Sequence, residues 1–242
     1  MPAYGRDLAF IHDTGFTGFI RKAAPGLFGL LGRNGIRGGL VVDAGCGSGV
    51  WARELTGRGY GVLGIDISAA MIRLARRQAP GARFQTGSFL TAELPACDAV
   101  TAIGEVVNYA FDPRSGKKGL AAFFRRVHGA LRPGGVFIFD IVEPGAGEGA
   151  PPRRFLEGPG WAILLEVRED RRRKTLTRRI VSFRQNGKHY RRSEETHRLH
   201  LYSGPELLKE LTGAGLEADL LSGYGKFKFG PAHAALLARK PV

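Results

Sequence analysis

Cysteine, methionine and tryptophan are scarce in this chain of 242 residues, which has two of each. Two cysteines cannot build a disulfide framework, so we expect a reducing, cytoplasmic environment. The six histidines are scattered, and the sequence has neither paired Cys residues nor an H-E-x-x-H pattern, which predicts no metal site. No apolar run approaches the ~20 residues of a membrane span. The first residues also lack the basic-then-apolar order of a signal peptide.

Acidic residues are few as well, because 22 Asp and Glu stand against 36 Lys and Arg, giving a formal net charge of +14. Much of the excess lies in a basic run over residues 168–192. On strands, alternate members of such a run share a face. This pattern indicates a solvated outer face or a charged edge strand, and the alternative is a surface that follows phosphates.

Glycine, by contrast, is abundant, with 36 residues, and three of them alternate with small residues in one informative stretch, residues 41–49, with the sequence VVDAGCGSG. Two β-branched residues and an acid precede Gly45, Gly47 and Gly49, and residues 50–55 continue with helical spacing. Glycine suits such a turn because it tolerates positive φ and leaves the backbone open to a ligand. The stretch therefore predicts a strand, a tight binding turn and the start of a helix.

A second apolar run, residues 61–65, ends on Asp66, seventeen residues after Gly49. An acid at the tip of the second strand can accept the hydroxyls of a ribose, as in nucleotide-binding βαβ units. The dinucleotide pattern G-x-G-x-x-G is not met, because Val50 stands where the third glycine belongs. A ligand that contains a nucleoside is thus expected, but not a dinucleotide.

The pattern D-x-G-x-G-x-G resembles the first motif of the class I S-adenosylmethionine-dependent methyltransferases. Residues 61–72, 87–90, 97–105 and 131–137 resemble further motifs of that family, in the same order. The resemblance covers roughly residues 40–142. It implies an α/β fold with a doubly wound, mostly parallel, seven-stranded Rossmann-like sheet, and S-adenosyl-L-methionine as cofactor.

Hydrophobic periodicity and turn signals place the elements without reference to any family. We expect a single domain that begins with a helical lid (1–36), two short helices split at Pro25. A cofactor-binding core follows (37–149), with strands near 40–43, 61–65, 82–86, 97–103 and 135–141. An inserted antiparallel sheet (150–203) has three strands, near 161–167, 175–183 and 189–202, with Asn186-Gly187 as a hairpin signal. A closing helix and two strands occupy 204–242.

The resemblance also implies a set of cofactor-binding residues. In the family the glycine loop holds the methionine part of the cofactor, the acid after the second strand takes the ribose, and the following positions flank the adenine. Aromatic residues of the lid are either contacts to the cofactor or core residues. The implied residues are Tyr4, Phe16, Asp43, Gly45, Cys46, Gly47, Gly49, Asp66, Ile67, Met71, Ser88, Phe89 and Gly104.

Two residues are candidates for the catalytic site. Glu105 follows the fourth strand, where the family's substrate meets the methyl group. It is expected to orient an amine or accept a proton from it, with a solvated loop acid as the alternative. In the inserted sheet, Glu195 and His197 share one face by the period of two. His197 is a candidate base or orienting donor, with a structural pair to Glu195 as the alternative. Tyr109 and Glu195 are expected to contact the substrate.

These observations predict methyl transfer from S-adenosylmethionine to N or O of a small molecule, by a monomer or homodimer without a membrane partner. One alternative is a methyltransferase acting on RNA or another polyanion. Against it, the loop after residue 104 lacks the Asn/Asp-Pro-Pro-aromatic turn that usually accompanies methylation of base amines. A second alternative is a non-catalytic, cofactor-binding assembly protein.

Overall fold

The computed structural model describes residues 3–148, 151 and 153–242, and its largest element is a seven-stranded sheet. Six strands run parallel and β13 runs antiparallel to its neighbours. The order across the sheet is β10 (Glu217–Leu221), β13 (His233–Arg239), β5 (Leu131–Val142), β4 (Cys97–Ala102), β1 (Leu40–Ala44), β2 (Gly61–Asp66) and β3 (Arg83–Thr86). The expected doubly wound fold is confirmed.

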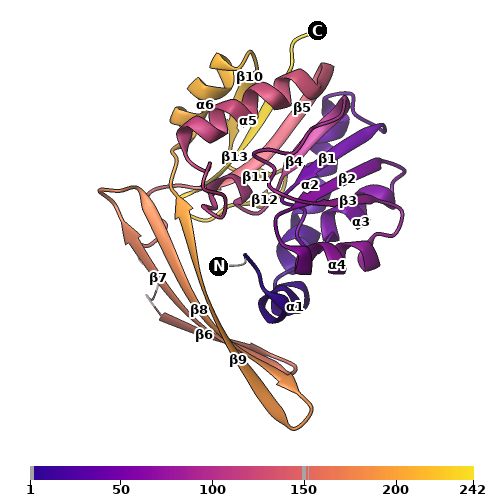
Figure 1. Ribbon diagram of the computed structural model, residues 1–242. Coiled ribbons are helices and arrows are strands. Elements are labelled where there is room, and N and C mark those ends of the chain that lie inside the picture. The colour runs from indigo at the N-terminus through magenta and orange to yellow at the C-terminus, as the bar shows by residue number, and fades with distance from the viewer. Residues whose placement is uncertain (1–2, 149–150, 152) are drawn as a thin grey trace.

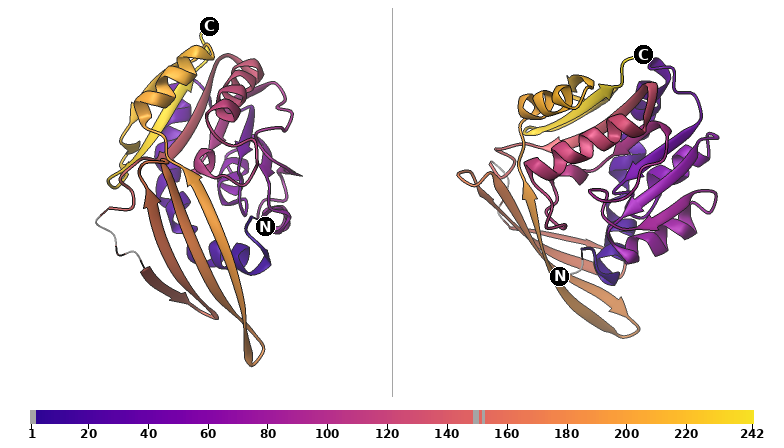
Figure 2. Two further views of the ribbon diagram at one scale, coloured as in Figure 1. Left: turned by 60° about the vertical axis from the view of Figure 1, so that its left-hand side comes forward. Right: turned by 45° about the horizontal axis from the view of Figure 1, so that its top comes forward.

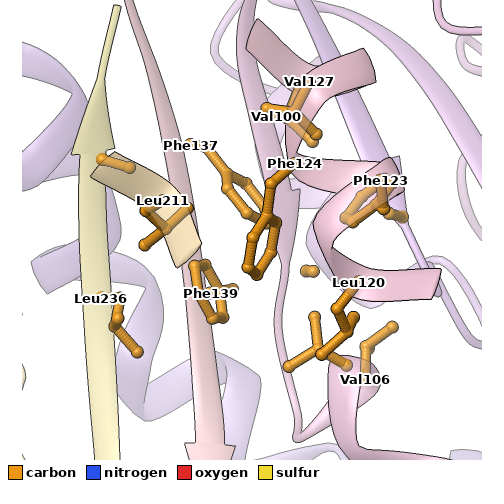
Figure 3. Packing of buried hydrophobic residues seen from close by; sticks show 14 of the residues in the cluster. Val100, Val106, Leu120, Phe123, Phe124, Val127, Phe137, Phe139, Leu211 and Leu236 are labelled. Carbon is orange, nitrogen blue, oxygen red and sulfur yellow. The ribbon is translucent and has the colours of Figure 1, made fainter. Parts of the chain in front are cut away.

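Helices cover both faces of this sheet because its strands bury alternate residues on opposite sides. In β5, Phe137 and Phe139 pack with α5 and α6, whereas Val136 and Ile138 pack with α2 and α3. Figure 3 shows the first of these clusters, where Phe123 and Phe124 of α5 meet Phe137 and Phe139. The helices are α1 (Arg6–Gly15), α2 (Gly18–Arg33), α3 (Val50–Thr56), α4 (Ala69–Gln78), α5 (Lys117–Ala130) and α6 (Gly204–Gly213), with a 3₁₀ turn, η1 (Val106–Asn108).

The lid breaks at a different place from the one expected. Pro25 lies inside α2, and the two helices separate near Phe16 and Thr17 instead. The helix continues through the proline because Leu27, Leu31 and neighbouring alanines bury its apolar face against the main sheet. This burial outweighs the lost backbone hydrogen bond.

The inserted sheet has four antiparallel strands rather than three: β6 (Arg153–Gly158), β7 (Trp161–Asp170), β8 (Thr175–Asn186) and β9 (His189–His200). The additional strand, β6, has mostly exposed side chains, so its sequence carries little of the periodicity that marks a strand. The expected start of the insertion, residue 150, lies outside the described residues. A small ribbon of β11 (Gly223–Tyr224) and β12 (Phe227–Lys228) was also not expected.

The inserted sheet projects from the carboxyl edge of the main sheet, and α1 lies between this sheet and α4 (Figures 1 and 2). Asp7 of α1 pairs with Arg184 and Arg191 of the inserted sheet. Gly15 at the end of α1 lies so close to Trp161 of β7 that a Cβ would approach the indole to 2.5 Å. The lid helix therefore packs directly on the inserted sheet.

Candidate active site

A cavity of about 860 Å³ lies between the carboxyl ends of the parallel strands and the inner face of the inserted sheet. Ligands of open α/β sheets bind at this edge, and the volume falls within the range of small-molecule sites. Most of the predicted site residues line this cavity: Tyr4, Phe16, Asp43, Gly45, Cys46, Gly47, Asp66, Ile67, Met71, Ser88, Phe89, Gly104, Glu105, Tyr109 and His197.

Two predicted residues do not line the cavity. Gly49 has φ +83, and a Cβ there would approach Cα of Ala75 to 2.8 Å, so the residue lets α3 and α4 pack closely. Glu195 lies behind His197, accepting from the Gly5 amide at 2.8 Å and lying 2.9 Å from Nε2 of His197. The geometry assigns Gly49 to packing and gives Glu195 a contact with the lid in place of direct substrate contact.

The floor of the cavity is formed by the glycine loop and two acids. The carboxylate of Asp66 accepts hydrogen bonds from the amides of Gly47 at 2.9 Å and Ser68 at 2.8 Å, which fixes it beside the loop. Burial raises its pKa, although these two amides oppose the shift. Asp66 thus has the position required of a ribose acceptor, and that role stays a prediction.

Asp43 is a buried acid with one carboxylate oxygen that has no hydrogen-bond partner among the described residues. Its Oδ1 accepts from the hydroxyl of Thr101 at 2.8 Å, but its Oδ2 is buried and accepts no hydrogen bond from the described residues. Burial raises the pKa of Asp43 to about 7. A buried acid with one unused oxygen fits a cationic ligand group, such as the ammonium group of S-adenosylmethionine. The residues present therefore fit this cofactor.

Glu105 lies at the opposite wall and has backbone angles in the left-handed region, with φ +61. Asp140 at the end of β5 holds this turn, accepting from the amides of Gly104 and Glu105 at 2.8 Å each. Burial raises the pKa of Asp140 to about 6, even though Tyr224 also donates to it. A strained non-glycine residue that is held by a buried acid is typical of a functional position.

The carboxylate of Glu105 is fully engaged. Oε2 accepts from Nη1 of Arg178 at 2.7 Å, and Oε1 lies 3.1 Å from Nε2 of His233. Burial alone would raise the pKa of Glu105, but Arg178 and His233 outweigh it and lower the pKa to about 2. Glu105 is therefore ionised near neutrality and is poorly suited to take a proton. The interpretation of Glu105 as a solvated loop acid is wrong.

His197 is 2% exposed and lies among the rings of Tyr4, Tyr109 and Phe111, with ring centroids 4.8–5.9 Å away. The predicted pair with Glu195 is present. The predicted burial of this face of β9 is confirmed, since Leu199 and Leu201 are also buried. Both packing and hydrogen bonding hold the imidazole in place, which suits a positioning role.

Among the cavity-lining residues that the sequence analysis did not assign to the site are His12, Arg178 and His233. Burial lowers the pKa of His12 to about 4, so its imidazole is neutral. Arg178 was expected to belong to an exposed basic strip, but its position on β8 turns it inward. The alternation of β8 was the available signal for Arg178, whereas His12 and His233 reach the cavity only through the tertiary fold.

No group of three or more His, Cys, Asp or Glu side chains able to hold a metal ion occurs among the described residues. None of the helices in the same part of the chain is long and apolar enough to cross a membrane.

Comparison with known proteins agrees with this geometry. Residues 41–135 match a family model described as a methyltransferase domain. The chain is 26% identical over 231 residues to a dTDP-3-amino-3,6-dideoxy-alpha-D-glucopyranose N,N-dimethyltransferase of Streptomyces fradiae, covering 91% of this chain and 88% of that one. The chain therefore carries a methyltransferase domain over residues 41–135 and has the fold of S-adenosylmethionine-dependent methyltransferases. It is therefore an enzyme, which sets aside a non-catalytic assembly protein.

Two further methyltransferases differ in how much of the chain they match. A ubiquinone biosynthesis O-methyltransferase of Methylobacterium sp. (strain 4-46) is 35% identical over 128 residues, half of this chain and 48% of that one. The SAM-bound structure of CalS10, an amino pentose methyltransferase from Micromonospora echinaspora, has a TM-score of 0.76 at 20% identity and covers 99% of both chains. The latter likeness includes the inserted sheet and the lid.

Proposed function

We infer that this methyltransferase acts on an amine nitrogen of a small polar molecule, with an amino sugar as the favoured class. The observation that carries this proposal is the state of Glu105, the acid nearest the expected acceptor position. Its pKa of about 2 and its two cationic partners leave it unable to deprotonate a hydroxyl near neutrality. An amine in its free-base form already has the lone pair that methyl transfer needs.

The comparisons support the same choice. Two of the relatives that match over nearly the whole chain are named as an N,N-dimethyltransferase of an amino sugar and as an amino pentose methyltransferase. The O-methyltransferase matches only about half of the chain. Since the inserted sheet forms one wall of the cavity, the likeness that includes this sheet is the more informative one for the acceptor.

When bound, S-adenosylmethionine supplies an electrophilic methyl group on its sulfonium. We assign the cofactor to Asp43, Gly45, Gly47 and Asp66, and the acceptor to the side lined by Glu105, Tyr109 and His197. The protein's own contribution is then to orient the acceptor and exclude water. Arg178 and His233 favour a neutral amine over an ammonium ion, because like charges disfavour the charged form.

A screen for release of S-adenosylhomocysteine tests this proposal. Each amino sugar is paired with the sugar that has a hydroxyl at the same carbon, alongside simple amines, phenols, carboxylates and total RNA. We expect turnover with amines and none with the matched hydroxyl compounds. Turnover confined to phenols or hydroxyls would overturn the choice of nitrogen, and turnover confined to RNA would overturn the small-molecule acceptor. Cytoplasmic location and the monomer or homodimer state stay predictions.

A further inference from the structure

We propose that Arg178, together with the phenols of Tyr4 and Tyr109, binds an oxyanion of the methyl acceptor, a carboxylate or a phosphate, close to the nitrogen that is methylated. This inference rests on the proposed function and names a second recognition element within the same cavity. Three segments of the chain build this cluster, namely the lid, the loop after β4 and the inserted sheet.

Arg178 has hydrogen-bond donors to spare. An arginine carries five N–H groups in a planar fork. Nη1 of Arg178 donates to Glu105 at 2.7 Å and to the hydroxyl of Tyr109 at 3.2 Å. Within the described residues, no hydrogen bond engages its Nε or Nη2. Because the side chain lines the cavity and keeps 22% of its surface exposed, three N–H groups are free to meet a ligand.

The two phenols add a further donor. The hydroxyls of Tyr4 and Tyr109 lie 3.1 Å apart, and either can donate to the other. Only one of the two O–H protons can lie in this hydrogen bond, whichever hydroxyl donates it. The other O–H proton has no acceptor among the described residues. Burial raises the pKa of both phenols, which keeps both protons in place near neutrality.

The acceptor groups beside the cluster already serve protein donors. Each carboxylate oxygen of Glu105 faces a cation, Arg178 or His233. Both ring nitrogens of His233 face acceptors, with the carbonyl of Pro231 3.0 Å from Nδ1 and Glu105 3.1 Å from Nε2. These two acceptors raise the pKa of His233 and favour its imidazolium form, although burial and Arg178 oppose the shift. The carboxylate of Asp140 accepts hydrogen bonds from two backbone amides and from the hydroxyl of Tyr224.

This wall therefore presents unused donors and a cationic guanidinium, and an oxyanion is the ligand group that satisfies both. The position relative to the cofactor follows from packing. A Cβ on Gly45 of the glycine loop would approach Cγ1 of Val106 to 2.4 Å, so the segment that carries Glu105 abuts the cofactor loop. Arg178, held on Glu105, lies next to the same junction, which places the oxyanion near the reacting nitrogen.

The test is an NMR titration of the complex saturated with S-adenosylhomocysteine, which occupies the cofactor loop. The probes are inorganic phosphate, acetate and, as a neutral match to acetate, acetamide. The variants are Arg178→Gln and Arg179→Gln. Arg179 is the adjacent residue on β8, points to the outer face and pairs with Glu194, so its removal lowers the total charge equally.

We expect the wild-type complex to bind at least one anion more tightly than acetamide, and Arg178→Gln to weaken that binding roughly tenfold while Arg179→Gln leaves it unchanged. Tyr4→Phe, which removes a donor but no charge, should weaken it severalfold and serves if Arg178→Gln does not fold. Whichever of phosphate and acetate binds more tightly identifies the oxyanion.

Equal binding of acetate and acetamide with no phosphate binding, or equal losses in the Arg178 and Arg179 variants, would overturn the proposal. Anion binding is read without turnover, so its failure is distinguishable from failure of methyl transfer to amines.

Discussion

Asp43 and Glu105 are two carboxyl groups of one cavity whose pKa values shift in opposite directions. Asp43 receives one hydroxyl donor, so burial dominates and raises its pKa to about 7. Glu105 is less buried, with 17% of its side chain exposed, and Arg178 and His233 overcome the effect of burial and lower its pKa to about 2. The surroundings of each side chain thus leave Asp43 able to bind a cationic ligand group and keep Glu105 ionised near neutrality.

The first prediction concerns Asp43 and pH. A cationic ligand group needs the ionised carboxylate, so below a pKa of about 7 a proton must leave before binding. Affinity for S-adenosylhomocysteine should therefore rise with pH, by about tenfold per unit at most, and level off above about pH 7. Calorimetry between pH 5.5 and 7.5 measures this. Asp43→Asn should bind more weakly and lose the slope, whereas a pH-independent affinity in the wild type would contradict the assignment.

The second prediction concerns Glu105. Glu105→Gln keeps the shape of the side chain but removes the charge that holds Arg178 and His233. We expect turnover to fall by ~10²-fold, with the affinity for S-adenosylhomocysteine unchanged, since Glu105 lies on the acceptor side. Glu194→Gln on the outer face of the inserted sheet is the matched control. Full activity on the true acceptor would show that Glu105 has no part in positioning.

At the scale of elements, the turn between β1 and α3 uses its glycines for different purposes. Gly47 has φ +54 and open space where a Cβ would point, whereas Gly49 has φ +83 and meets the backbone of Ala75. One glycine therefore leaves room at the cavity, and the other lets two helices approach each other.

This difference gives the third prediction. Gly49→Ala should lower the free energy of unfolding by about 2–5 kcal/mol, from backbone strain plus overpacking. Gly47→Ala should cost only the strain of about 1–3 kcal/mol, but should weaken S-adenosylhomocysteine binding more, because its Cβ enters the cavity. Urea unfolding and calorimetry on both variants measure the two effects. The reverse pattern would return Gly49 to the binding surface.

The lid and the inserted sheet act together as elements. Tyr4 accepts a hydrogen bond at its backbone oxygen from Ser68, next to Asp66, while its hydroxyl meets Tyr109. On the other side, Asp7 binds two arginines of the inserted sheet. One short segment thus touches the cofactor side, the acceptor side and the sheet that closes the cavity.

At the scale of the whole molecule, fewer of the basic side chains behind the net charge of +14 are free on the surface than the sequence indicates. Many arginines of the basic run pair with acids outside it, such as Arg179 and Arg192 with Glu194, or lie inward, as Arg178 does. The charge is therefore partly neutralised locally, rather than forming a continuous strip.

The fourth prediction follows from that pairing. Nonspecific RNA binding should be weak and should vanish by physiological salt, with a shallow dependence on salt concentration. Fluorescence anisotropy with a labelled single strand measures it, and reversal of the exposed Arg172 and Lys188 should change it little. Sub-micromolar binding with a steep salt slope would favour the polyanion alternative.

The sequence was sufficient for most of the fold because its signals are local. The alternation of strands and helices, the glycine turn and the Asn186-Gly187 hairpin each act within a few residues. The acceptor side of the cavity was harder, because Arg178 and His233 meet Glu105 only after the inserted sheet folds back over the parallel strands. Strand β6 was not expected for a related reason. Its pairing with β7 makes it a strand, and its own sequence lacks the periodicity of one.

The central claim, methyl transfer to nitrogen of an oxyanion-bearing small molecule, is tested most directly by the position of the transferred methyl group. The enzyme is incubated with S-adenosylmethionine labelled with ¹³C at the methyl carbon and with the acceptor found by screening. NMR correlation spectra of the product then show which atom carries the label. We predict a ¹³C-methyl group on nitrogen, formed in equal amount with S-adenosylhomocysteine. A labelled methyl group on oxygen or carbon would contradict the account.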